Sequence, residues 1–351
     1  METLLEAEHT YQNSSGALRD RDYWLDLMKQ QYHPVCLSSG QSIPCSDVVT
    51  DQRSIPLDTY ARLNALAEMN GSNFATLITA LTAIYLYRMT GEMSLMVGFV
   101  HSGRMSRALR RTIGMTANVL PLGIQVNPEM SLTELLGQVK TNITRTARHS
   151  RYYSEELRQT LGQSGESALW FRTSINYVPS QYEVKFGDIA ASVENTAIGP
   201  VDDFAFTFYD RGPSLGLTLY LNANAALYEQ KEVSRHLHRL CHFLTEVATA
   251  DVTCPCQIEV ISAEERAQVL SAGQGAMMDL PEHQGIHQFV EQQALYQPND
   301  IAVVFEDQSL TYTVLNQQAN QLAYGLMAKG WVPEAGWRLL WNAVAPWWWR
   351  C

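Results

Sequence analysis

Hydrophobic and polar positions follow two periods along this chain, and their order predicts a mixed α/β protein. Apolar residues at helical spacing predict helices over 56–69, 72–91, 131–149 and 228–247. Short apolar or alternating runs predict strands over 93–100, 118–126, 171–178, 204–209 and 215–221. Helices and strands that interleave in this way are typical of a layered α/β domain.

Several boundaries follow from start and stop residues. Ser72 is expected to cap the second long helix, and Gly91 to end it. Ser131 and Glu134 form the pattern of a capping box, which predicts a helix start. A short helix is expected from Asp22 to Met28. Residues 1–20 are polar, so we expect a loose N-terminal segment.

A break in the pattern divides the chain. Residues 271–282 combine Gly, small residues and a Pro without periodicity, which predicts a linker. Beyond it we expect a helix over 283–296, a strand over 301–305, a turn at Glu306–Gln308, and a helix that runs to about Lys329. Residues 254–261 are predicted to be a crossing strand or a linker.

The last residues, 337–351, hold five of the eight tryptophans and follow neither period. One interpretation is a functional aromatic patch. The other, which we adopt, is a non-native tail from a truncated or frameshifted reading frame. The expected organisation is therefore a first part over 1–270, the linker 271–282, a second part over 283–336, and the tail 337–351.

Composition limits the possible functions. Hydrophobic residues make up 46% and charged residues 17%, which is enough for a large core. The formal net charge of −11 argues against nucleic acid as a partner. The start carries no apolar signal segment, and the long uncharged stretch 69–87 contains Asn70 and Asn73, so we expect a buried helix and no membrane span. Six irregularly spaced cysteines favour reduced thiols, and together these features predict a cytoplasmic protein.

Metal and nucleotide sites are not expected. Cys254 and Cys256 are separated by one residue, which is too short for a zinc knuckle. His236 and His238 are two positions apart on a predicted helix, so their side chains should diverge. The sequence also contains no glycine-rich phosphate-binding loop. We therefore expect no metal and no cofactor bound by this chain.

Several segments together resemble the condensation domain of nonribosomal peptide synthetases. Asp22-Tyr23-Trp24 resembles a helix of that family, and Val97–Arg104 is similar to its strand with a Gly-Arg element. Ile113–Leu122 resembles its Ile-Gly-x-Phe-Val-Asn-Thr motif, with Thr116 and Ala117 in place of Phe-Val. Arg148–Tyr152 with Glu155 resembles the following motif, and Asp203-Phe204 matches the family's Phe-Asp element loosely, in inverted order.

A second resemblance begins after the linker. Ile286–Glu291, Pro298, Ile301-Ala302-Val303 and Leu310–Asn316 are similar to the start of an adenylation domain, with Val314 where that family usually has Glu. The order of the two resemblances, condensation then adenylation, is that of a synthetase module. The sequence around 148–153 and 199–203 resembles the enterobactin-synthetase type, which implies a siderophore product.

The resemblance implies a fold. We expect a CoA-dependent-acyltransferase-like α/β sandwich, as one lobe of the two-lobed condensation fold, followed by a fragment of an adenylate-forming, AMP-binding domain. A single lobe should expose its partner face, so we also expect poor solubility.

The resemblance further implies a reaction, the formation of amide bonds between carrier-tethered thioesters, and the activation of an amino acid in the intact enzyme. Expected partners are carrier domains bearing 4'-phosphopantetheine and the rest of the synthetase, with ATP and Mg²⁺ used elsewhere in that enzyme. The family's catalytic His lies in a His-His-x-x-x-Asp-Gly segment, and this sequence has no His-His pair. We therefore assign no catalytic residue and expect the chain alone to be inactive.

Arg104 and Asn118 are the candidates for the substrate channel that the resemblance implies. An Arg can meet a pantetheine phosphate, and an Asn can orient a carbonyl. The alternative is that Arg104 pairs internally and Asn118 satisfies backbone groups. His101 and His149 lie beside family motifs, and we favour structural roles for both.

Two other functions remain open from the sequence. One is a non-catalytic remnant that docks carrier domains. The other is a stand-alone CoA-type acyltransferase, against which the lack of the His segment counts.

Overall fold

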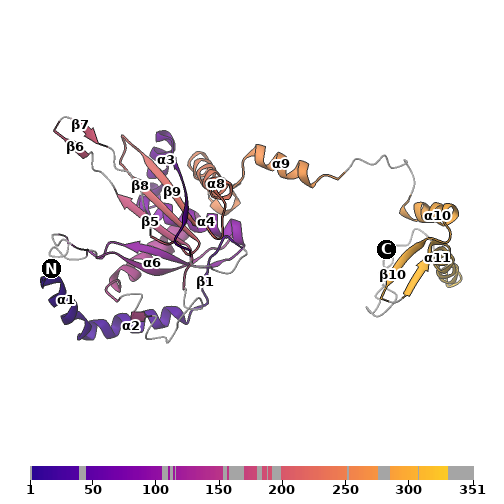
Figure 1. Cartoon of the computed structure of the whole chain (residues 1–351), viewed down its shortest axis with the longest axis horizontal. Helices are drawn as coiled ribbons and strands as arrows, with labels where there is room; N and C mark the ends of the chain where they lie inside the picture. The colour runs from indigo at the N-terminus through magenta and orange to yellow at the C-terminus, as the bar shows by residue number, and fades with distance from the viewer. Residues whose placement is uncertain are drawn as a thin grey trace. The chain divides into compact units, whose positions relative to one another are not determined.

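The first unit of the chain holds a central sheet with helices packed against it. A computed structural model describes residues 2–38, 45–104, 110, 114, 116–152, 156–157, 170–179, 184–187, 189–191, 199–250, 253–275, 285–306 and 308–330. The chain divides into two compact units, Met1–Ser271 and Ala272–Cys351 (Figure 1).

Among the described residues, the first unit has the helices α1 (Glu2–Gln12), α2 (Ser15–Met28), α3 (Leu57–Met69), α4 (Phe74–Thr90), α6 (Leu132–Arg148), α8 (Gln230–Thr249) and α9 (Ala263–Gly273). Its strands are β1 (His33–Pro34), β2 (Val48–Ser54), β3 (Ser94–His101), β4 (Asn118–Gln125), β5 (Ser174–Pro179), β6 (Val184–Phe186), β7 (Ile189–Ala191), β8 (Phe204–Asp210) and β9 (Leu217–Asn224). A 3-10 turn, η2, covers Pro255–Gln257.

The main sheet is mixed. Its strands follow the order β1-β3-β5-β8-β9-β2, and β4 pairs with β3. Strands β3, β5 and β8 run parallel, while β4, β9 and β2 are antiparallel to their neighbours. The β3–β4 register runs from Ser94↔Gln125 to His101↔Asn118, so these last two residues face each other at one end of the pair. Strands β6 and β7 form a separate hairpin.

The core lies between one face of this sheet and four helices. Phe204, Phe206 and Phe208 alternate along β8 and are fully buried, as are Leu217, Leu219 and Leu221 along β9. These side chains belong to one cluster with the apolar residues of α3, α4, α6 and α8. Helix α4 is buried along most of the length from Phe74 to Leu86, and its one charged residue, Arg88, lies beyond this part, in the last turn. No helix among the described residues is long and apolar enough to cross a membrane.

Most predicted elements are confirmed within a few residues, two predictions are wrong, and some strands were not predicted. Residues 1–20 are not loose, because α1 and the first part of α2 are helical. The cap of α4 is Asn73, whose Oδ1 accepts from the Thr76 amide, and not Ser72. Residues 254–261 join α8 to α9 through a 3-10 turn, which agrees with the predicted linker and not with the crossing strand. Strand β2 was not predicted, because every position after Val49 is polar or charged and the strand lies at the sheet edge.

The second unit contains α10 (Ile286–Tyr296), β10 (Ile301–Phe305), β11 (Gln308–Thr311) and α11 (Tyr312–Met327). Strands β10 and β11 pair antiparallel, and the Thr311 hydroxyl accepts from the Val314 amide to cap α11. Neither α10 nor α11 has a buried residue, and Ile286, Leu295 and Tyr324 are exposed. The predicted tail 337–351 lies outside the described residues.

Candidate functional site

The shared end of β3 and β4 carries the candidate site residues. The chain turns after His101 through Gly103, which has a φ of +67°. A Cβ at Gly103 would lie 1.9 Å from the carbonyl oxygen of Thr116, so only glycine fits. The Thr116 hydroxyl donates to the Ser102 carbonyl at 2.8 Å and holds the two segments together.

Arg104 follows this turn and contacts the same neighbouring segment. Its Nη2 donates to the carbonyl of Gly114 at 2.9 Å, and its own carbonyl accepts from Arg110 Nε at 3.3 Å. Internal pairing of Arg104, the alternative raised from the sequence, is thus present in the structure. Ile113 and Met115 of the resembling motif lie outside the described residues, as does Glu155 of the next one.

Asn118 is buried at the start of β4, with 9% of its surface exposed. Its Nδ2 lies 3.2 Å from the carbonyl oxygen of Ser150 and 3.4 Å from that of Tyr152. The side-chain amide therefore holds the turn that follows α6 against the end of β4. Its role toward a substrate stays a prediction, and so does that of Arg104.

His101 lies directly opposite Asn118 in the β3–β4 register. Its Nδ1 accepts from the Gly103 amide at 3.1 Å, which places the ring proton on Nε2. Burial lowers the pKa of His101, so the neutral ring is favoured near pH 7.

His149 lies in the turn that Asn118 holds. Its Nδ1 is 2.8 Å from Asp20 Oδ1, and its ring stacks on Tyr23 with 4.0 Å between the centroids. Both His149 and His101 thus have contacts inside the protein, and among the described residues neither assembles with a second His.

A buried carboxylate, that of Asp203, lies at the start of β8. The sequence indicated it only as part of a loose motif match. Asp203 is 0% exposed and accepts from Tyr228 Oη at 2.5 Å, Cys36 Sγ at 3.1 Å and the Leu37 amide at 3.0 Å. Thr173 Oγ1 lies 3.2 Å from the same carboxylate. Burial and the Asp203 charge raise the pKa of Tyr228. Asp203 therefore joins the start of β8 to the segments after β1, before β5 and before α8.

The histidines of α8 diverge as predicted. His236 Nδ1 lies 2.8 Å from the Tyr85 hydroxyl, whereas His238 Nδ1 lies 2.7 Å from Arg53 Nη1. Burial, with the positive charge of Arg239, lowers the pKa of His236 to about 4. Over the part of the chain that the structure describes, no group of three His, Cys, Asp or Glu could hold a metal ion.

Comparison with known proteins places these features in one family. The family model of the condensation domain matches residues 3–270. The chain is 28% identical over 334 residues to the dimodular nonribosomal peptide synthase of Bacillus subtilis (strain 168), covering 95% of this chain and 14% of that protein. It is 25% identical over 332 residues to enterobactin synthase component F of Escherichia coli (strain K12), covering 93% of this chain and 25% of that protein.

Solved structures give the same result. The chain is similar to a double mutant of the starter condensation domain of rhizomide synthetase RzmA in complex with C8-CoA and Leu-SNAC, with 29% identity and a TM-score of 0.66. That match covers 74% of this chain and 58% of that one. The first condensation domain of the calcium-dependent antibiotic synthetase matches with 26% identity and a TM-score of 0.66, over 73% of this chain and 56% of that one.

The family match covers most of the chain, the matched fold is that of solved condensation domains, and the β3–β4 end with its glycine turn and Asn118 lies within the matched residues. The chain therefore belongs to the condensation-domain family.

Proposed function

We propose that this chain is one lobe of a condensation domain of a nonribosomal peptide synthetase, followed by the first part of an adenylation domain. Together with the lobe that carries the family's His-His-x-x-x-Asp-Gly segment, it forms amide bonds between carrier-tethered thioesters. The family match over residues 3–270 carries this proposal.

The proposed division of labour rests on how much of the fold is matched. The chain spans 58% and 56% of the two solved condensation-domain chains, and its sequence contains no His-His pair. Amide formation needs an amine and a thioester held together, and a base that takes a proton. This lobe supplies walls and placement, and the other lobe supplies the base.

Arg104 and Asn118 are proposed to line the channel. Both lie at the shared end of β3 and β4, next to a turn that only glycine can make. A guanidinium there can attract a phosphate of a tethered pantetheine arm, and a fixed carboxamide can orient a thioester carbonyl. The contacts of both residues inside the protein hold them in place for such roles.

The adenylation assignment is supported by the second unit. The 334 aligned residues of the Bacillus subtilis relative cannot fit within residues 3–270, so the similarity continues past the family match. The β10–β11 hairpin and its two helices bury no helical side chain, which is expected of a fragment that packs against further sequence. The siderophore product stays a prediction, because 25% identity to the enterobactin enzyme does not exceed the 28% found elsewhere.

Reconstitution from two pieces tests the proposal. The full chain is mixed with a separately expressed condensation lobe that carries the His-His segment, and with two loaded carrier proteins; carrier-bound amide is measured by intact mass spectrometry. Amide should form with both pieces, and none with either piece alone or when the two His of the added lobe are replaced by Ala. Carrier capture by the full chain without amide under any combination would favour a docking remnant instead.

Adenylation gives a separate test. The chain alone should show no amino-acid-dependent pyrophosphate exchange, because its sequence has no glycine-rich phosphate loop. Exchange above background would contradict this.

A further inference from the structure

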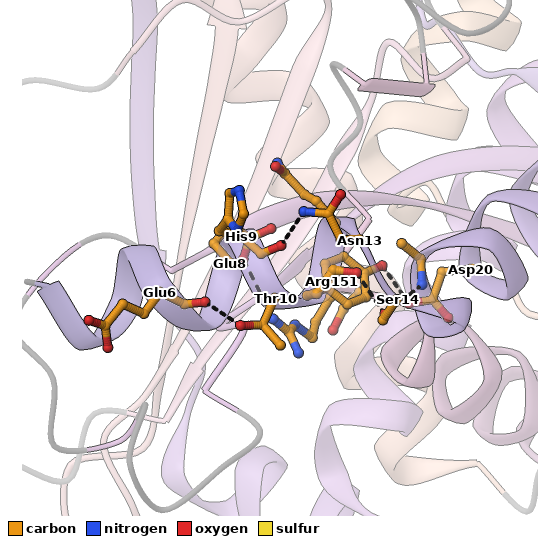
Figure 2. Close-up of polar contacts among 12 residues, drawn as sticks. Glu6, Glu8, His9, Thr10, Asn13, Ser14, Asp20 and Arg151 are labelled. Carbon is orange, nitrogen blue, oxygen red and sulfur yellow. Dashed lines mark hydrogen bonds and ion pairs between the residues drawn. The ribbon is translucent and has the colours of Figure 1, made fainter.

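The two N-terminal helices pack against the turn whose carbonyls accept from Asn118. We call α1 and α2 (Glu2–Met28) the strap, and His149–Tyr152 the turn. The guanidinium of Arg151 lies 4.0 Å above the ring of Tyr11, and its Nη2 lies 3.7 Å from Glu8 Oε2. Figure 2 shows Arg151 lying along α1 between Glu8 and Asp20. The strap is therefore fixed to the turn by an aromatic contact and by charge.

Asp20 is the centre of these contacts. Its Oδ1 lies 2.8 Å from His149 Nδ1, and its Oδ2 accepts from the Tyr11 hydroxyl at 2.6 Å. The two carboxylate oxygens of Asp20 thus fix the orientation of the His149 ring and of the Tyr11 hydroxyl. Only 14% of the Asp20 side chain is exposed, so water competes little for these bonds.

The backbone of the turn is held from the same side. Trp24 Nε1 donates to the carbonyl of His149 at 3.1 Å, and Tyr23 stacks on the His149 ring. Two further carbonyls of the turn, those of Ser150 and Tyr152, accept from Asn118 Nδ2. An unbroken chain of contacts therefore runs from Asp20 through His149 and the turn to Asn118.

We propose that Asp20 and His149 are positioning residues, which set the orientation of the Asn118 carboxamide through the turn. The inference rests on the proposed function only in taking Asn118 as a channel residue; the coupling itself is a property of the first unit. If the strap shifts, the Ser150 and Tyr152 carbonyls shift with it, and the amide loses its two acceptors. The strap would then control how well this end of the channel is formed.

A purely stabilising role makes a different prediction. In that case Asp20 variants lower the free energy of unfolding and leave Asn118 unchanged in molecules that remain folded. The two roles are separated by a readout on the Asn118 side chain itself, measured where every variant is folded.

The test uses the full chain with ¹⁵N-labelled asparagine and measures exchange of the Asn118 side-chain amide protons with water by NMR. The Asn118 signals are identified by their loss in Asn118→Ser. Asp20→Ala should speed this exchange about tenfold, since a hydrogen bond to a charged group is removed. Asp20→Asn keeps an acceptor for His149 Nδ1 and should restore exchange to within about twofold of the wild type.

Two controls complete the design. Asp26→Ala removes a carboxylate of the same helix that pairs with exposed Lys29, and should leave Asn118 exchange unchanged. Tyr60→Phe removes a bond to Asp210 elsewhere in the unit and reports any general loosening. The proposal is overturned if Asp20→Ala leaves Asn118 exchange unchanged, if Asp20→Asn behaves like Asp20→Ala, or if Tyr60→Phe has the same effect. No outcome depends on amide formation, so a failed reconstitution leaves this test intact.

Discussion

Replacing Asp203 by alanine should strongly destabilise the first unit. The side chain is fully buried and accepts from Tyr228, Cys36 and the Leu37 amide. Removing it leaves a buried hydroxyl and a half-buried backbone amide without an acceptor, at about 1–3 kcal/mol each, and a thiol at less. The Thr173 proton can still go to the Val35 carbonyl, at 3.0 Å. We expect a loss of about 4 kcal/mol in the free energy of unfolding.

Urea unfolding of the full chain, followed by far-UV circular dichroism and tryptophan fluorescence, measures this loss. Asp203→Asn should lose less than Asp203→Ala, because one oxygen remains to accept. Asp26→Ala, which removes an exposed carboxylate, serves as the control and should leave the midpoint unchanged within error. A loss below about 1 kcal/mol for Asp203→Ala would show instead that the three donors find other acceptors at little cost in free energy.

Three further predictions concern other parts of the first unit. The pKa of His236 in the folded chain, about 4, lies below the ordinary value of 6.5. The contribution of the neutral ring to the free energy of unfolding is therefore fully present above pH 6.5 and is lost as the pH falls from 6.5 to 4. In urea unfolding over that pH range, the wild type should lose about 3 kcal/mol more of this free energy than His236→Gln. Gly91→Ala should lower the free energy of unfolding by about 1 kcal/mol, because Gly91 has a φ of +76°. Gly103→Ala should lower it clearly more in the same urea assay, because the added Cβ would also clash with the Thr116 carbonyl. Glu265→Ala should speed backbone amide exchange across α9 in hydrogen-exchange mass spectrometry, because the side chains of the Arg239–Glu265 pair are only 17% and 18% exposed. Glu259→Ala breaks a more exposed ion pair with Arg266, and equally fast exchange in that variant would contradict this prediction.

The periodic part of the fold could be predicted from the sequence. Buried helices and core strands repeat their apolar residues at a fixed spacing, and capping signals such as Ser131 with Glu134 act within a few residues. Strand β2 was not predicted because two of its positions that contact α8 are charged. Asp51 accepts from Ser234 of α8, and Arg53 contacts His238 of the same helix. A contact between a charged side chain and a distant helix cannot be recognised from the local sequence pattern.

Helix α1 was not predicted from the sequence for a similar reason. It is polar along most of its length, and Tyr11, which is buried near its end, contacts Asp20 and Arg151. The site shows the same division. The glycine turn and the presence of Asn118 could be inferred from a family motif. The carbonyls that Asn118 contacts lie 32 and 34 residues away in the sequence, so these contacts could be identified only from the folded structure.

Amide formation by this lobe should require a second lobe that provides the catalytic His. This requirement is measured by intact mass spectrometry of two loaded carrier proteins after incubation with the purified full chain. The carrier masses should stay unchanged with the chain alone, and a carrier-bound amide should form once the His-bearing lobe is added. An amide formed by the chain unaided would show that the second lobe is not needed.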